Sequence, residues 1–219
     1  MSRFIFLLFA LAGIAFAHPH IFIDATTDVI FNETEFVGVQ NSWTFDPIYS
    51  QAMFATGDKN GDGKIDESEL SFFQKKAIDE FISFSRFNYI GDGTQFYIPK
   101  EIQNLKVFLN KENRLVIQFL NAFHIPANSS DYTMIVLVVN DPSNYISITI
   151  DMEKAQVKSP SNLEVDYFVD ALEGLTQFQN FSKTVKGLYV RYKKSHLNFS
   201  FISRYFLCVR LCRCELQKI

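Results

Sequence analysis

One stretch of the sequence, Asp58 to Glu69 (DKNGDGKIDESE), constrains its local structure more tightly than any other. It matches the calcium-loop pattern D-x-[DN]-x-[DN]-G-x5-E at every specified position. Calcium takes about six to eight oxygen ligands, and Gly63 permits the sharp turn that brings such ligands together. Lys64 would supply its backbone carbonyl. The predicted side-chain ligands are Asp58, Asn60, Asp62, Asp66 and Glu69. The alternative interpretation is a solvated acidic turn without a bound ion.

The segments that flank this loop predict two helices. Upstream, Asp46 is a candidate N-cap and Pro47 suits the first helical position. Downstream, apolar residues recur at helical spacing, and they are Leu70, Phe73, Ala77, Ile78 and Phe81. Gly57 stands where an apolar residue is common, so we expect the first helix to fray at its end. Together these features predict an EF-hand helix–loop–helix at about 46–84.

The start of the chain is typical of a secretory signal peptide. Residues 1–17 hold one positive charge, an apolar run and small residues at the A-x-A positions. The run from Phe4 to Phe16 is too short to span a membrane comfortably. We therefore predict cleavage between Ala17 and His18, with a periplasmic or secreted product that does not span a membrane after cleavage.

Cleavage there would expose a second candidate metal site. His18 would offer its α-amine and its imidazole, and His20 lies two residues further on. Pro19 has no N–H, which excludes the square-planar mode that uses the amide nitrogen of the second residue. Imidazole suits Zn²⁺, Ni²⁺, Co²⁺ or Cu²⁺. The alternative is that both histidines are simply solvated.

The remainder of the chain reads as β structure. Three runs are rich in β-branched and aromatic residues and are separated by turn signals: NRLVIQFLNAFHI, YTMIVLVVN and NYISITID. A hairpin is predicted around Asn32, Glu33 and Thr34. The predicted fold class is α+β, an antiparallel β-sandwich-like domain over residues 18–194 with the EF-hand inserted. A doubly wound parallel sheet is the alternative, and His124 is expected to be a core or edge histidine.

The end of the chain differs in composition from the rest. Residues 195–219 hold all three cysteines, Cys208, Cys212 and Cys214, among arginines and short apolar runs. Their number and spacing fit neither a paired disulfide framework nor a standard zinc site. We interpret this segment as an atypical tail outside the folded domain.

Composition excludes several functional classes. The 21 basic and 24 acidic residues give a formal charge of −3, so nothing indicates a nucleic-acid partner. The sequence holds no Ser/His/Asp set, no reactive cysteine in the domain and no phosphate loop, so we expect no enzymatic activity.

The motifs together resemble a known family. The stretches AHPHIFIDA, WTFDPIYS, DKNGDGKIDESEL and YISITI are similar to an uncharacterised bacterial exported family, described as the periplasmic component of an ABC-type transport system. The resemblance runs from about His18 to Lys186 and implies a link with nickel, cobalt or zinc transport and a membrane metal permease as partner.

Three functions follow as hypotheses. The first is a calcium-binding, non-catalytic accessory of a transition-metal transporter. The second is a calcium-stabilised structural or adhesive module with no transition-metal role. The third is a copper enzyme that uses His18 with His20 or His124.

Overall fold

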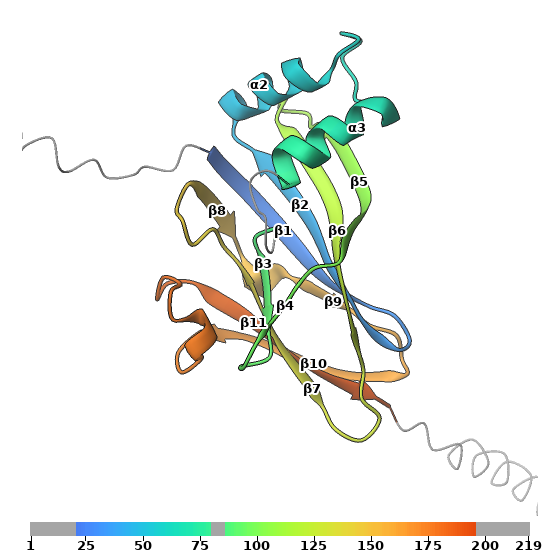
Figure 1. The fold of residues 1–219 in the computed structure, drawn as a ribbon, viewed down its shortest axis with the longest axis vertical. Helices are drawn as coiled ribbons and strands as arrows, with labels where there is room; N and C mark the ends of the chain where they lie inside the picture. Colours follow the sequence, from blue (N-terminus) through green and yellow to red (C-terminus); the bar gives the residue numbers. More distant parts are fainter. Residues whose placement is uncertain (1–20, 80–85, 196–219) are drawn as a thin grey trace, which may run out of the picture.

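The protein, described by a computed structural model over residues 21–79 and 86–195, has two β-sheets and a pair of helices at one end (Figure 1). The predicted α+β class is therefore confirmed in its coarse form, with a large excess of strand over helix. The predicted signal peptide, His18, His20 and the cysteines of the tail lie outside the described residues.

The first sheet has the strand order β5-β6-β2-β1-β8, and β9 also pairs with β1. Side chains of β1 alternate strictly between buried and more exposed, as expected for a strand with one face on the core. The predicted hairpin is confirmed, because Asn32 Oδ1 accepts hydrogen bonds from the Thr34 and Glu35 N–H groups, both at 2.9 Å. The strands are β1 Ile21–Phe31, β2 Glu35–Phe45, β5 Glu101–Leu109, β6 Leu115–Pro126, β8 Ile146–Ile150 and β9 Gln156–Lys158.

The second sheet has the order β10-β11-β7-β3-β4, and all its pairings are antiparallel. In chain order its strands are β3 Asn88–Gly91, β4 Phe96–Tyr97, β7 Thr133–Val139, β10 Leu163–Ala171 and β11 Lys186–Lys194. Short 3₁₀ turns at Met152–Lys154 and Thr176–Phe178 lie in the connections.

The prediction of a wholly antiparallel fold is wrong at one edge. Strand β1 runs parallel to β8, with Ile21 opposite Ile146, and parallel to β9, with Val29 opposite Val157. The reason is topological, since β7 belongs to the second sheet and the chain crosses to the first sheet before β8 begins. The chain enters β8 at Ile146, beside Ile21 at the start of β1, so the two strands run in the same direction.

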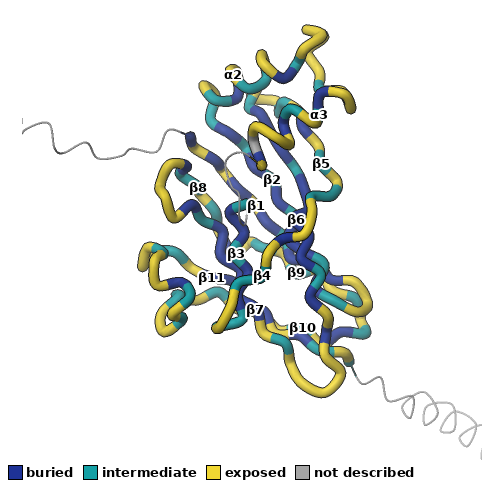
Figure 2. The backbone as a smooth tube through the Cα atoms, viewed as in Figure 1, coloured by how far each residue is buried: buried dark blue, intermediate teal, exposed yellow. Residues whose placement is uncertain are grey.

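The two sheets share one hydrophobic core (Figure 2). The ring of Trp43 in the first sheet packs edge-on against Phe119, 4.7 Å between centroids. Phe31 of the first sheet contacts Tyr192 of the second at 4.8 Å. Burial raises the pKa of Tyr192 above its ordinary value, in keeping with this position in the core.

A polar contact also joins the two sheets inside this core. Asn88 of β3 accepts hydrogen bonds on Oδ1 from Asn41 Nδ2 at 2.8 Å and from Asn121 Nδ2 at 3.2 Å. Asn88 Nδ2 donates in return to Asn41 Oδ1 at 3.0 Å. All three asparagines are buried, so each bond offsets the cost of removing an amide from water.

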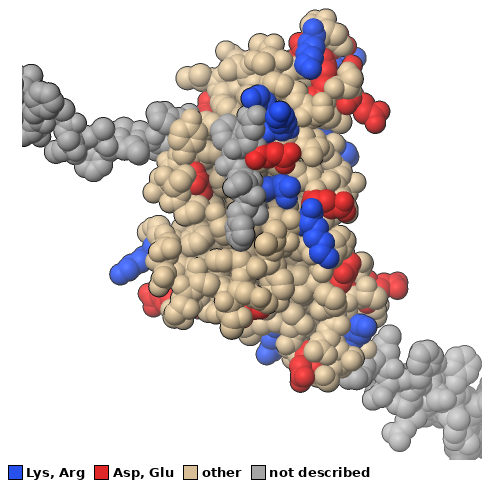
Figure 3. Space-filling view, viewed as in Figure 1, with Lys and Arg blue, Asp and Glu red and all other residues tan. Residues whose placement is uncertain are grey.

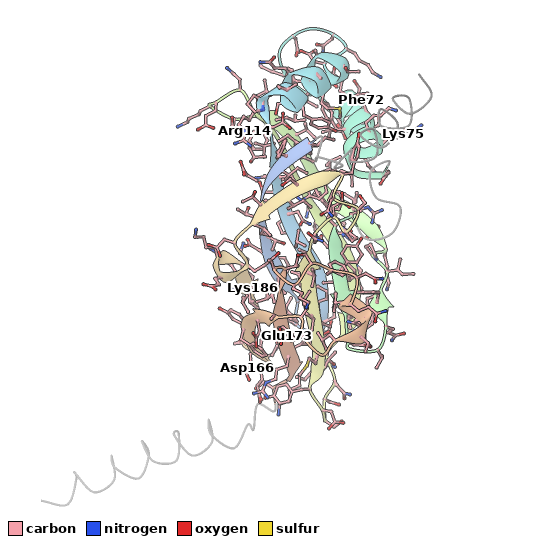
Figure 4. The ribbon with its side chains drawn as sticks, turned by 90° about the vertical axis from the view of Figure 1, so that its left-hand side faces the viewer. Phe72, Lys75, Arg114, Asp166, Glu173 and Lys186 are labelled. Carbon is pink, nitrogen blue, oxygen red and sulfur yellow. The ribbon has the colours of Figure 1, made fainter. Side chains whose placement is uncertain are left out.

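The helices are α2, Pro47–Gly57, and α3, Glu67–Gln74, and both begin as the sequence predicts. Asp46 Oδ1 accepts from the Tyr49 N–H at 2.9 Å, which confirms it as the N-cap. Strand β2 leads directly into α2, and Arg114 braces this junction by donating to the Phe45 carbonyl at 2.7 Å. Arg114 lies at the same end of the molecule as Phe72 of α3 (Figure 4).

The second helix departs from the prediction of a regular α-helix that continues to about Phe84. It ends at Gln74, and Lys75–Asp79 form a π-helical turn. Phe73 and Ile78 are both completely buried, five residues apart. The wider turn brings residues five apart closer to one face of the helix than an α-helix does, and both side chains enter the core. Residues 80–85 lie outside the described part of the chain.

Candidate metal-binding loop

Asp58 organises the first half of the loop between α2 and α3. Its Oδ1 accepts hydrogen bonds from the N–H groups of Gly61 at 2.8 Å and Asp62 at 3.2 Å, and its Oδ2 accepts from Gly63 at 2.9 Å. Gly61 and Gly63 have φ angles of 71° and 79°, the left-handed region that glycine adopts without strain. The carboxylate of Asp58 therefore points into the loop.

Asn60 and Asp62 follow the same pattern. Asn60 Oδ1 accepts from the Asp62 N–H and Asp62 Oδ1 accepts from the Lys64 N–H, each at 2.8 Å. Each side chain is thus held on the inside of the turn by the backbone two residues further on. Asp62 Oδ2 is left available for another partner.

Glu69 joins the two ends of the loop. Its Oε1 accepts from the Lys59 N–H at 2.8 Å and the Asn60 N–H at 3.3 Å, and its Oε2 accepts from the Asp66 N–H at 3.0 Å. The residue is only 2% exposed, whereas the other acidic residues of the loop are more accessible. A buried carboxylate with several N–H partners is well placed to bind a cation, because it is held in position before the cation arrives.

Asp66 is the N-cap of α3. Its Oδ1 accepts from the Ser68 N–H at 2.8 Å and the Ser68 hydroxyl at 2.6 Å. These bonds hold the pKa of Asp66 below its usual range, and the bond from the Ser68 hydroxyl contributes most. Asp66 and Glu69 form a capping box. The D-x-x-E spacing in the sequence could have predicted this second role for both residues.

The loop thus fixes each acidic or amide side chain that the sequence analysis selected. It does so mainly through bonds to backbone N–H groups. In residues 21–79 and 86–195, no group of three or more His, Cys, Asp or Glu side chains converges as metal ligands would. Carboxylate and amide oxygens in one short turn are nevertheless the donors that Ca²⁺ prefers.

His124, expected to be a core or edge histidine, is partly buried in β6, an interior strand of the first sheet. It lies in β6 near a register shift between β2 and β6, and its φ of 58° reflects the local irregularity. Its Nδ1 is 2.8 Å from Glu35 Oε1. Glu35 was not selected from the sequence, and no local signal could have found it, since the two residues are 89 positions apart.

The surface and the helices add two further observations. In the face shown in Figure 3, basic and acidic side chains are interspersed instead of forming a field of one sign. Among the helices of the described residues, none is long and apolar enough to cross a membrane.

The fold defines an α+β protein of two sheets that carries a helix–loop–helix at one end. A family model matches residues 3–167, and the chain belongs to that family, DUF1007, a family of proteins of unknown function. No curated protein matches the chain. The membership agrees with the predicted resemblance to an uncharacterised family.

Proposed function

We propose that this protein is an exported calcium-binding protein in which the 58–69 loop holds one Ca²⁺ between α2 and α3. The observation that carries the proposal is the position of Glu69, a carboxylate that is 2% exposed and bonded to N–H groups from both halves of the loop. Asp58, Asn60 and Asp62 would supply further side-chain oxygens, Lys64 its carbonyl, and Asp66 a direct or water-mediated ligand.

The ion would stabilise the loop electrostatically. The loop carries the carboxylates of Asp58, Asp62, Asp66 and Glu69 in one short turn. These like charges repel one another, and a divalent cation would neutralise them. Because Ca²⁺ would bind the folded loop and not the unfolded chain, binding would raise the free energy of unfolding.

The role of the ion would be structural, because both helices are already anchored. Ser50 of α2 and Phe73 of α3 are completely buried against the rest of the protein. A sensor would need to release such side chains on binding calcium. We therefore infer that calcium holds the two helices in place without opening them.

We further propose that the protein acts, without catalysis, in the periplasm as a metal-handling accessory of a transition-metal transporter. Support comes from the predicted mature terminus His18-Pro19-His20 and from the resemblance that links such sequences with nickel, cobalt or zinc transport. A membrane permease would be its partner. A calcium-stabilised structural or adhesive module with no transition-metal role is the second candidate.

Thermal unfolding with and without Ca²⁺ tests the calcium site. At a concentration of ten times Kd, we expect the free energy of unfolding to rise by about 1.4 kcal/mol. Asp58→Ala and Glu69→Ala should abolish the shift, whereas Glu67→Ala, which removes an exposed carboxylate outside the predicted ligand set, should retain it. An unchanged melting temperature, or binding of a hydrophobic dye on addition of calcium, would contradict the structural role.

Metal analysis of the correctly cleaved protein separates the two candidate functions. Stoichiometric zinc, nickel or cobalt supports the transport accessory, and calcium alone supports the structural module. Copper with redox turnover would instead support an enzyme. A variant that keeps one extra residue before His18 moves the α-amine away from the imidazole. Equal transition-metal affinity of both forms would exclude the terminal site.

A further inference from the structure

Strand β10 is a long, regular edge of the second sheet. Its nine residues pair with β11 from Leu163 opposite Lys194 to Ala171 opposite Lys186, without a register shift. On its other side, no strand of the described residues pairs with it. The Ser195 N–H donates to the Asn162 carbonyl in the same register, so alternate residues of β10 bond to β11. The N–H and C=O groups of Val165, Tyr167 and Val169 consequently point away from the sheet.

The same three residues present side chains that the rest of residues 21–79 and 86–195 covers only in part. Tyr167 lies opposite Val190, which is completely buried, so both side chains lie on the face of the sheet that packs on the core. Tyr167 is nevertheless 53% exposed, and Val165 and Val169 are only half-buried. Figure 2 shows this edge as mostly exposed or intermediate. Among the described residues, the core is therefore only partly covered along β10.

Strand β5, an edge strand of the first sheet, is protected against pairing in the way that edge strands usually are. It has a register shift between Gln103 and Lys106, and Asn104 there adopts a φ of 55°. Lys106 is exposed on that strand. Bulges and lysines discourage pairing with another chain. Strand β10 has no bulge, no lysine and no proline.

We propose that β10 pairs antiparallel with β10 of a second copy of this chain, about a twofold axis at Tyr167. The sequence Val165-Asp166-Tyr167-Phe168-Val169 is symmetric in its inward-facing residues. The twofold pairing therefore places Val165 against the partner's Val169 and the two Tyr167 rings beside each other. It also aligns the free N–H and C=O groups of both edges, and it joins two five-stranded sheets into one.

The charges on the outer face of β10 are compatible with this pairing. Asp166 is bound by Arg191 at 2.8 Å and Glu164 by Lys193 at 3.2 Å. Asp166 would face the partner's Phe168. Glu164 would face the partner's Asp170, a like-charge pair that the twofold axis repeats, and Lys193 offsets the charge of Glu164 in each copy.

The interface would leave the 58–69 loop free. Asp166 of β10 lies toward the end of the molecule opposite the helices (Figure 4), and Figure 1 places β10 and α2 at opposite ends. Dimerisation and calcium binding can thus be tested separately. A dimer that forms equally well without Ca²⁺ is the expected result.

The mass of the full exported chain, measured by sedimentation across a wide concentration range, tests the proposal. We expect a concentration-dependent doubling of mass. Tyr167→Pro should abolish it, because proline removes an N–H that the dimer needs and the monomer does not bond. A thermal melt shows whether this variant still folds. A chain that stays monomeric, or a folded Tyr167→Pro variant that still dimerises, would overturn the proposal.

Two further variants test the register without relying on proline. With Cys208, Cys212 and Cys214 replaced by serine, Tyr167→Cys should form a disulfide-linked dimer under oxidation. Phe168→Cys should not, because residue 168 and residue 168 of the partner would be diagonal neighbours, too far apart for a disulfide. Asp170→Lys should tighten the dimer about two- to five-fold by replacing a like-charge pair with an opposite one. Cross-linking at 168 instead of 167, or weakening by Asp170→Lys, would exclude this register.

Discussion

Gly57 and Phe73 fit together only because Gly57 has no side chain. A Cβ on Gly57 would overlap the ring of Phe73 and would lie 3.1 Å from Phe72 Cδ1. The glycine that the sequence analysis treated as a weak helix end is therefore a position where α3 packs tightly on α2. Helix α2 continues to Gly57 without early fraying.

Gly57→Ala should lower the free energy of unfolding by up to about 2 kcal/mol. Overpacking of about 1–3 kcal/mol outweighs the gain of about 1 kcal/mol in helix propensity. Denaturant unfolding measures the change. In a Phe73→Leu background the smaller side chain relieves the overlap, and Gly57→Ala should become neutral or stabilising. An equal effect in both backgrounds would show that the contact with Phe73 is not the cause.

Ser50→Ala should destabilise the protein by about 1–3 kcal/mol. Ser50 Oγ is completely buried, accepts from the Leu115 N–H at 2.9 Å and donates to the Phe45 carbonyl at 3.2 Å. Alanine leaves a buried N–H without its acceptor. Thermal and denaturant unfolding measure the loss, and Ser71→Ala at an exposed position of α3 is the matched control. Equal stabilities of the two variants would contradict a role of this hydroxyl.

Asn88→Ala should cost about 3 kcal/mol or more, because it removes the acceptor of two buried amide groups. It also removes a polar contact between the two sheets. Denaturant unfolding measures the change, with exposed Gln51→Ala as the control for loss of an amide. If Asn88→Ala lowers the free energy of unfolding no more than Gln51→Ala does, the asparagine cluster does not stabilise the core.

The pH dependence of stability should include a contribution from Asp92. Burial alone would raise its pKa, but the Gln95 N–H and the Thr94 hydroxyl and N–H donate to the carboxylate and hold its pKa well below the usual value. A lowered pKa stabilises the folded state above the unfolded pKa of about 3.9, and this contribution is lost as the pH falls through the folded value. Stability should therefore decline below about pH 4.

Asp92→Asn isolates this contribution from that of the other acids. The variant should show a shallower decline of the free energy of unfolding below about pH 4, because the asparagine does not titrate. Urea unfolding at a series of pH values measures both curves. Parallel curves for the two proteins would mean that Asp92 has the same pKa in the folded and unfolded states.

The sequence by itself determined the features that depend on neighbours in the chain. The Asp46 cap, the turn at Asn32 and the inward side chains of Asp58 and Asn60 all rest on bonds within a few residues. Such bonds are dictated by residue type and spacing, so a pattern is enough to predict them. Strands β6, β7 and β8 were equally accessible, because β-branched and aromatic residues between turn signals are a local pattern.

Tertiary structure alone decided what depends on residues far apart in the chain. The parallel pairing of β8, the Glu35–His124 contact and the Asn41–Asn88 contact join segments whose sequences carry no mark of each other. The π turn after Gln74 was not predicted either, since the helical periodicity of the sequence indicated a continuous α-helix and Phe73 and Ile78 are buried on either side of the change in geometry. The free edge of β10 has the same origin, since strand order decides which strand lies last in a sheet and the sequence of a strand does not.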